Sequence, residues 1–221
     1  MILRHRRLTV LAAGVAVAVL VACSGGSSSS GGVLIRGVAR QGGSLAFPLP
    51  PADQVARLTT AAGLALEVRE TLIHHVHAHL DVFIDGEHRS VPGGIGIVIT
   101  NPGVRSATVQ GAPAYGGIAG CDQPCISPLH THDITGIIHT ESATAQDNTM
   151  GQFFQEWDVR LDASCVGTYC APATAIHVYV DGKELPLADA ASIDLSDQKE
   201  IAITIGKSPV VVPAAADFSG A

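Results

Sequence analysis

The sequence holds 221 residues, with 13 lysines and arginines against 20 aspartates and glutamates, which gives a formal net charge of −7. This acidic balance repels phosphate backbones and argues against nucleic acid as a partner. The length suffices for one domain with a real hydrophobic core, or for a domain with a small appendage.

The chain begins with three arginines within seven residues, followed by an uncharged apolar run over residues 8–22. Such a run is short for a helix that spans a bilayer, and its basic flank is typical of a signal peptide. We therefore predict a signal peptide over residues 1–22. The arginines also leave open a twin-arginine signal, which exports folded proteins, beside plain charge in an ordinary signal.

The end of this segment predicts lipidation. Leu20-Val21-Ala22-Cys23 matches the lipobox of bacterial lipoproteins, whose cysteine is acylated on sulfur and becomes the mature N-terminus. We expect Cys23 to carry lipid, palmitate included, that anchors the protein to the extracytoplasmic face of the cell membrane. The alternative is an ordinary signal peptide with a chance cysteine. The Gly/Ser-rich stretch after Cys23 favours the lipobox, because a flexible polar tether holds a folded domain off a surface.

Removal of the signal peptide takes away three arginines and no acidic residue, so the mature chain holds 10 basic and 20 acidic residues and a formal net charge of −10. Residues 23–45 are interpreted as a flexible tether and lead-in. Residues 46–221 are interpreted as a single His-rich β domain.

The first half of this domain changes its periodicity along the chain. Residues 52–64 have the pattern of a short helix. Residues 73–85 alternate strictly between apolar and polar side chains, which indicates a half-buried strand. Asp85-Gly86 then has the composition of a hairpin turn, and residues 91–100 continue in β-rich sequence. Residues 101–127 are Gly- and Pro-rich and predict a long loop.

The second half contains further strands and one helix. Residues 129–141 return to strand character, and Thr149 with Gln152 forms a capping box that should start a helix through Trp157. Strands are expected over 175–180 and 200–206, the first again ending in Asp-Gly. The pattern as a whole predicts a mainly β fold, a single small β-sandwich or barrel-like domain with two short helices.

Four cysteines remain after the lipidated one: Cys121, Cys125, Cys165 and Cys170. An even number outside the cytoplasm indicates disulfides. Three pairings are possible, two of them joining the two cysteine-bearing segments, and the sequence does not choose among them. Cys125 also lies near a histidine motif, which leaves a ligand role open for it.

The ten histidines are unevenly placed, and six of them fall in three motifs. The motifs are His75-x-His77-x-His79, His130-x-His132 and His139-x-Glu141. On a strand, residues two apart point to the same side at roughly 6.6 Å, so two imidazoles can converge on one ion. A turn at Thr135-Gly136 would fold the third motif back onto the second. We therefore predict one metal ion among these six histidines.

Nitrogen ligands with optional carboxylates suit Zn(II) or Cu(II), and Ni(II) and Fe(II) as well. Zinc is the first expectation outside the cell, because it requires no reductant, and copper(II) is the second. The mature chain holds a single methionine, which excludes methionine-rich Cu(I) carriage. Three acidic residues are expected to orient a ligand histidine, and two of them, Asp133 and Glu141, are candidate general bases. The third is Asp81.

Other residues receive an ordinary interpretation. His74, His88 and His177 are expected at the surface or in turns. Phe153, Phe154 and Trp157 have helical spacing and predict core. Three charged side chains are expected to be solvated: Glu156, Asp158 and Arg160.

Four segments carry a resemblance to a known group of proteins. They are HAHLDVFIDG (77–86), VPGGIGI (91–97), PLHTHDITGIIHTES (128–142) and GQFFQEWDVRL (151–161). Together they resemble an uncharacterised family of bacterial secreted or membrane-anchored proteins, over roughly residues 72–206. The resemblance implies one domain and a shared histidine site, and it implies no reaction. Cys165 and Cys170 lie outside the resembling pattern, which favours a structural role for them.

Three functions remain open from the sequence. The first is an extracytoplasmic lipoprotein that binds zinc or copper(II) through its histidine cluster. The second is a metal-dependent hydrolase or hydratase with three histidine ligands and an open position. The third is a structural or interaction module without a metal. A non-haem iron triad is disfavoured, because His79 and Asp81 share their strand face with His77. The expected partners are the membrane, through the lipid, and the metal ion; no protein partner is indicated.

Overall fold

A mixed β-sheet organises the computed structural model, which describes residues 44–209 and 211–219. The signal peptide, Cys23 and nearly all of the tether predicted above lie outside the described residues. The sheet order is β10 (Lys183–Leu185), β9 (Ile176–Val180), β11 (Lys199–Ile205), β1 (His74–Ile84), β6 (Ile137–Ser142) and β5 (Leu129–His130). The mainly β class is therefore confirmed.

The long strand β1 lies at the centre of the sheet and has different neighbours on its two sides. Along one side it pairs in parallel with β11, whereas its other side pairs first with β6 and then with the short β2 (Glu87–Arg89), both antiparallel. The strand is long enough to hold both partners in succession. This arrangement places β6 between β1 and β5, which decides the geometry of the site below.

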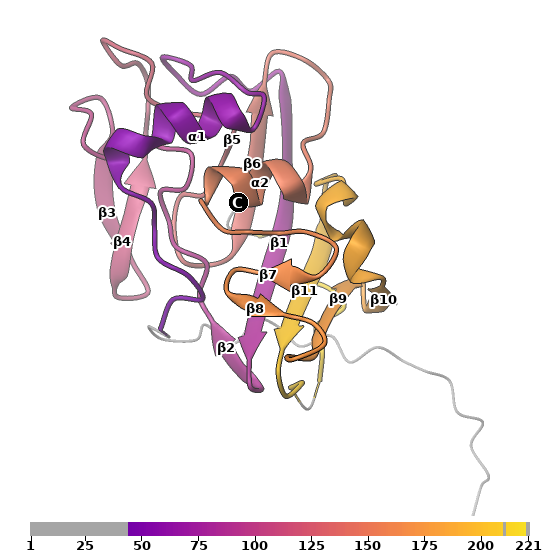
Figure 1. Cartoon of the computed structure of the whole chain (residues 1–221). Coiled ribbons are helices and arrows are strands. Elements are labelled where there is room, and N and C mark those ends of the chain that lie inside the picture. Colours follow the sequence, from indigo (N-terminus) through magenta and orange to yellow (C-terminus); the bar gives the residue numbers. More distant parts are fainter. Residues whose placement is uncertain (1–43, 210, 220–221) are drawn as a thin grey trace, which may run out of the picture. The chain divides into compact units, whose positions relative to one another are not determined.

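The alternation predicted for β1 divides the sheet into two faces. Its apolar side chains, Ala78, Leu80 and Val82, are buried against helix α2 (Met150–Glu156). Figure 1 shows α2 lying across this face, with α1 (Val55–Ala61) beside it. Two 3-10 helices add short turns, η1 (Ala52–Gln54) and η2 (Leu187–Ser192). The opposite face of the sheet carries His75, His77 and His79 of β1.

Local sequence features formed as predicted. The capping box of α2 is complete: the Gln152 N–H donates to Thr149 Oγ1 at 3.3 Å, and the Thr149 N–H donates to Gln152 Oε1 at 2.9 Å. Asp85-Gly86 and Asp181-Gly182 both lie in the left-handed region, with φ of 53° and 84° in the first pair and 49° and 75° in the second. They close the β1–β2 and β9–β10 hairpins. The two Asp-Gly segments are thus two similar hairpins.

Two expectations about the middle of the chain were wrong. Residues 91–100 form turns instead of a strand, although Val91, Ile95 and Ile97 are buried. Gly94 and Gly96 adopt φ of 96° and 73°, so the backbone bends where the apolar composition suggested extension. The predicted loop 101–127 contains a hairpin, β3 (Arg105–Val109) with β4 (Ala112–Gly116). Strand β3 is largely exposed and has no buried face, so it left no alternation to detect.

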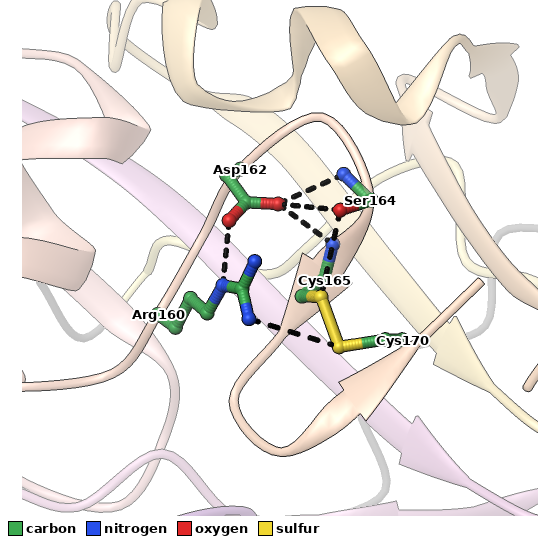
Figure 2. Close-up of a disulfide and its surroundings, with 5 residues drawn as sticks. All are labelled: Arg160, Asp162, Ser164, Cys165 and Cys170. Carbon is green, nitrogen blue, oxygen red and sulfur yellow. Dashed lines mark hydrogen bonds and ion pairs between the residues drawn. A yellow bond between two sulfur atoms is a disulfide. The ribbon is translucent and has the colours of Figure 1, made fainter.

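The cysteines pair locally. Cys121 bonds to Cys125 within the segment after β4, so Cys125 has no free thiolate to offer a metal. Cys165 bonds to Cys170 and closes the small hairpin of β7 (Cys165–Val166) and β8 (Tyr169–Cys170). Figure 2 shows Asp162 beside this second disulfide, accepting hydrogen bonds from the backbone N–H groups of residues 164 and 165 at 2.9 and 3.0 Å.

Candidate metal centre

The strand register gathers the histidine motifs on one face of the sheet. His77 on β1 lies opposite His139 on β6, and His139 lies opposite His130 on β5. One step along the sheet, His75 lies opposite Glu141. His139 therefore has an imidazole pair on each neighbouring segment, from β1 on one side and from β5 and the residues after it on the other.

His130 and His132 are oriented by backbone carbonyls. The Nδ1–H of His130 donates to Ser127 O at 2.9 Å, and the Nδ1–H of His132 donates to Tyr115 O at 2.6 Å. Their Nε2 atoms lie 3.2 Å apart. In the neutral form of both rings the hydrogen is on Nδ1, so both Nε2 atoms carry a lone pair and no hydrogen. A cation or an added proton between the two nitrogens would remove the repulsion between them.

Gly116, the last residue of β4, directly follows Tyr115, whose carbonyl accepts from His132, and it contributes to the orientation of that ring. A Cβ on Gly116 would lie 3.1 Å from His132 Nδ1, tighter than ordinary van der Waals contact. The missing side chain lets the His132 ring approach the β4 backbone. The β3–β4 hairpin, which the sequence did not predict, thus provides both the acceptor and the space for one histidine.

His139 and Glu141 complete a group of four donors. Glu141 Oε1 lies 3.4 Å from His139 Nδ1 and 3.9 Å from His130 Nε2. The ligand atoms of the four residues all lie within 4.8 Å of one another. In a tetrahedral zinc site with bonds of about 2.0 Å to nitrogen, neighbouring donors are separated by about 3.3 Å. The 3.2 Å between His130 Nε2 and His132 Nε2 and the 3.4 Å between His139 Nδ1 and Glu141 Oε1 are close to this value, whereas the 3.9 Å between Glu141 Oε1 and His130 Nε2 is longer.

The electrostatics of the group favour neutral His130 and His139 beside a carboxylate. Burial, followed by the charges of His132 and His139, holds the pKa of His130 well below its usual value of 6.5. Burial also lowers the pKa of His139. Burial alone would raise the pKa of Glu141, but the neighbouring histidines lower it on balance. Buried His139 Nδ1 and Glu141 Oε2 have no hydrogen-bond partner among the described residues.

A second group overlaps the first. The ligand atoms of His75, His77 and His139 also lie within 4.8 Å of one another. The ring centroid of His77 is 4.5 Å from that of His75 and 4.6 Å from that of His139. Burial, together with the charges of the other two rings, lowers the pKa of His77 to about 4. His139 therefore belongs to two possible ligand sets.

His79 lies apart from these five histidines. Its Nδ1 is 2.8 Å from Glu200 Oε2 and its Nε2 is 2.8 Å from Thr135 O, so both ring nitrogens face acceptors. Burial alone would lower the pKa of His79, but the hydrogen bond and charge of Glu200 raise it to about 8. The ring is an imidazolium in an ion pair at neutral pH. In this protonated form both ring nitrogens are engaged, although the ligand atoms of His79, Asp81 and Glu200 also lie within 4.8 Å of one another and form a third possible ligand set.

The other acidic candidates also have different contacts from those expected of them. Asp81 Oδ1 pairs with His88 Nε2 at 2.8 Å. The Asp81 carboxylate also lies within 4.8 Å of the ligand atoms of His79 and Glu200. Asp133 Oδ1 accepts both the N–H and the hydroxyl of Thr135, at 2.8 and 2.5 Å, in the turn before β6. Of the three acidic candidates, Glu141 alone lies within the four-donor group.

The histidines assigned to the surface each contact a carboxylate. His74 pairs with Asp147 at 2.8 Å and His177 pairs with Glu184 at 2.6 Å, and His88 pairs with Asp81 as described above. Among the described residues, none of these three histidines belongs to a group of donors that could hold a metal ion.

Glu156 is a clear correction, because it was expected to be solvated and is 1% exposed. It is three residues after Phe153 on α2 and so shares the buried side of that helix. Its Oε1 accepts a hydrogen bond from the Ser127 hydroxyl at 2.6 Å. The backbone carbonyl of Ser127 accepts the hydrogen bond of His130 Nδ1–H. Ser127 therefore connects the buried carboxyl of Glu156 to the four-donor group.

Comparisons with known proteins add no relative: no known protein family, no curated protein and no solved structure matches the chain. In residues 44–209 and 211–219, none of the helices combines the length and the apolar character that crossing a membrane requires.

Proposed function

We propose that this protein binds one divalent transition metal ion, zinc or copper(II), through His130, His132, His139 and Glu141. The observation that carries the proposal is the 3.2 Å approach of the two Nε2 atoms of His130 and His132. Protonation of either ring would also join them, but burial disfavours the charged form of His130. A metal ion satisfies both lone pairs without placing a proton on a buried ring.

The donor set favours binding over catalysis. Three imidazoles and one carboxylate fill a tetrahedral coordination shell, whereas catalytic zinc sites keep one position open for water. The carboxylate leaves a bound Zn(II) or Cu(II) with a net charge of +1, which lowers the cost of burying the ion. Nitrogen and oxygen donors suit both of these ions. A metal store or carrier therefore fits the site better than a hydrolase does.

We further propose that the site is displayed at the extracytoplasmic face of a membrane. The support is the lipobox that ends at Cys23 and the polar tether after it. Cys23→Ser should move the protein from the membrane fraction to the soluble fraction and remove fatty-acid labelling. Unchanged membrane association of this variant would refute the anchor without touching the metal proposal.

The metal proposal is tested by elemental analysis of the purified chain after zinc or copper(II) loading and gel filtration. We expect about one ion per chain, and none in His132→Ala, because a ligand is lost from the four-donor group. His88→Ala is the matched control, since it removes an imidazole that pairs with Asp81 and leaves the four donors intact. Equal metal content in the two variants would contradict the assignment.

A further inference from the structure

The two ligand sets that meet at His139 differ in access to solvent. We define the inner set as His130, His132, His139 and Glu141, and the outer set as His75, His77 and His139. The side chains of His130 and Glu141 are 1% and 5% exposed, whereas that of His75 is 35% exposed. His132 of the inner set is half-buried, so His75 is the most exposed donor of the two sets and the first that an ion arriving from water meets.

The two sets are in direct contact. His75 Nε2 lies 3.3 Å from Glu141 Oε1, which is the distance expected between two donors of one tetrahedral ion. His139 lies between them, with ring centroids 4.6 Å from His77 and 4.5 Å from His132. An ion can therefore exchange the β1 histidines for the β5-side histidines one at a time, while it stays bound to His139 or Glu141.

Simultaneous occupation of both sets is disfavoured by charge. Two divalent ions would lie within a few ångströms of each other, and the carboxylate they would share, Glu141, supplies one negative charge. Repulsion between two dications at such a separation is strong even at the effective dielectric of a protein surface. The outer set is accordingly a second position for the same ion.

We propose that His75 and His77 capture the metal ion at the surface and pass it to the inner set through the shared His139. This inference rests on the proposed function, because it assumes that the inner set holds the ion at equilibrium. The outer set then lies on the path for both binding and release. A path residue changes both rates by the same factor and leaves the equilibrium between free and bound ion nearly unchanged.

The test uses the double variant His75→Ala/His77→Ala of the full mature chain with zinc(II). Stopped-flow mixing with a chromophoric zinc chelator gives the rates of uptake and of removal, and equilibrium competition with the same chelator gives the Kd and the number of ions bound. We expect one ion per chain and a Kd within about threefold of wild type. Because two tethered imidazoles raise the local capture strength by a factor of about 10² or more, both rates should fall at least about tenfold.

His74→Ala is the matched control, since His74 belongs to the same strand but pairs with Asp147. It should leave both rates unchanged. His75→Ala alone, at the more exposed of the two positions, provides a second variant with little risk to folding. It should slow both rates in the same direction.

Three results would overturn the inference. Two ions per wild-type chain would make the outer set an independent centre. Unchanged rates in the double variant would remove it from the path, and complete loss of binding would make His75 and His77 equilibrium ligands. These results differ from failure of the proposed function itself, in which wild type holds no zinc or His132→Ala holds as much as wild type.

Discussion

Glu156 gives the sharpest test of the buried polar structure behind the histidines. Its carboxyl is 1% exposed, and burial raises its pKa from 4.5 to about 8, because the side chains of Ser127 and Thr59 offset only part of the cost of burying a charge. The carboxyl is therefore protonated in the folded protein at neutral pH and ionised in the unfolded chain. We consider the substitution Glu156→Gln, which keeps the shape and cannot ionise.

The magnitude follows from the two pKa values. Below pH 4.5 both states hold the proton and the carboxyl gives no pH dependence. Between pH 4.5 and about 8 the folded state binds one more proton than the unfolded state, so stability is lost as pH rises, by about 1.4 kcal/mol per pH unit. The accumulated loss is at most about 3 kcal/mol at pH 7 and about 5 kcal/mol at pH 8. The variant does not suffer this loss.

The assay is urea unfolding of metal-free wild type and Glu156→Gln at several pH values from 5 to 8. The free energy of unfolding of the variant minus that of wild type should rise with pH. An unpartnered amide N–H shifts this difference by about 1–3 kcal/mol at every pH and leaves its slope unchanged. Glu87→Gln, at an exposed position of β2, should give a flat difference. A flat difference for Glu156→Gln as well would refute the reasoning.

Three further predictions concern the metal site and the ion pair beside it. Gly116→Ala should weaken zinc binding by about 10–100-fold, because the added Cβ displaces the His132 ring from the Tyr115 carbonyl. Gly120→Ala is the control and should leave zinc binding unchanged, because open space surrounds Gly120. Competition titration measures the zinc affinity of both variants. His79→Ala should lower the free energy of unfolding in urea by about 3–5 kcal/mol, because it leaves buried Glu200 unpaired, with one zinc still bound. Since burial lowers the pKa of His130 and of His139 below 6.5, zinc should survive dialysis at pH 5.5 and be lost as these two rings gain protons at lower pH. Half-loss already at pH 6.5 would contradict this.

The sequence by itself determined the local structure around the site. Strict alternation over residues 73–85 predicted which side chains of β1 face together, because successive residues of a strand point to opposite sides. The Asp-Gly pairs predicted two hairpins, and the capping box predicted the start of α2. The mainly β class follows from such short-range rules, in which each residue acts on neighbours a few positions away. The prediction that the two histidines of an HxH motif can converge on one ion follows from the same rules.

Tertiary structure decided which histidines meet. His139 stands between two imidazole pairs because β6 lies between β1 and β5, and the register of that pairing is set by nonlocal packing. The parallel partner β11 places Glu200 opposite His79, so this histidine joins an ion pair although it lies on the same strand face as His77. The acceptor for His132 is a backbone carbonyl of Tyr115, which carries no residue-specific pattern. Strand periodicity fixes the face on which a side chain lies, whereas its partners depend on strands that the chain brings together from a distance.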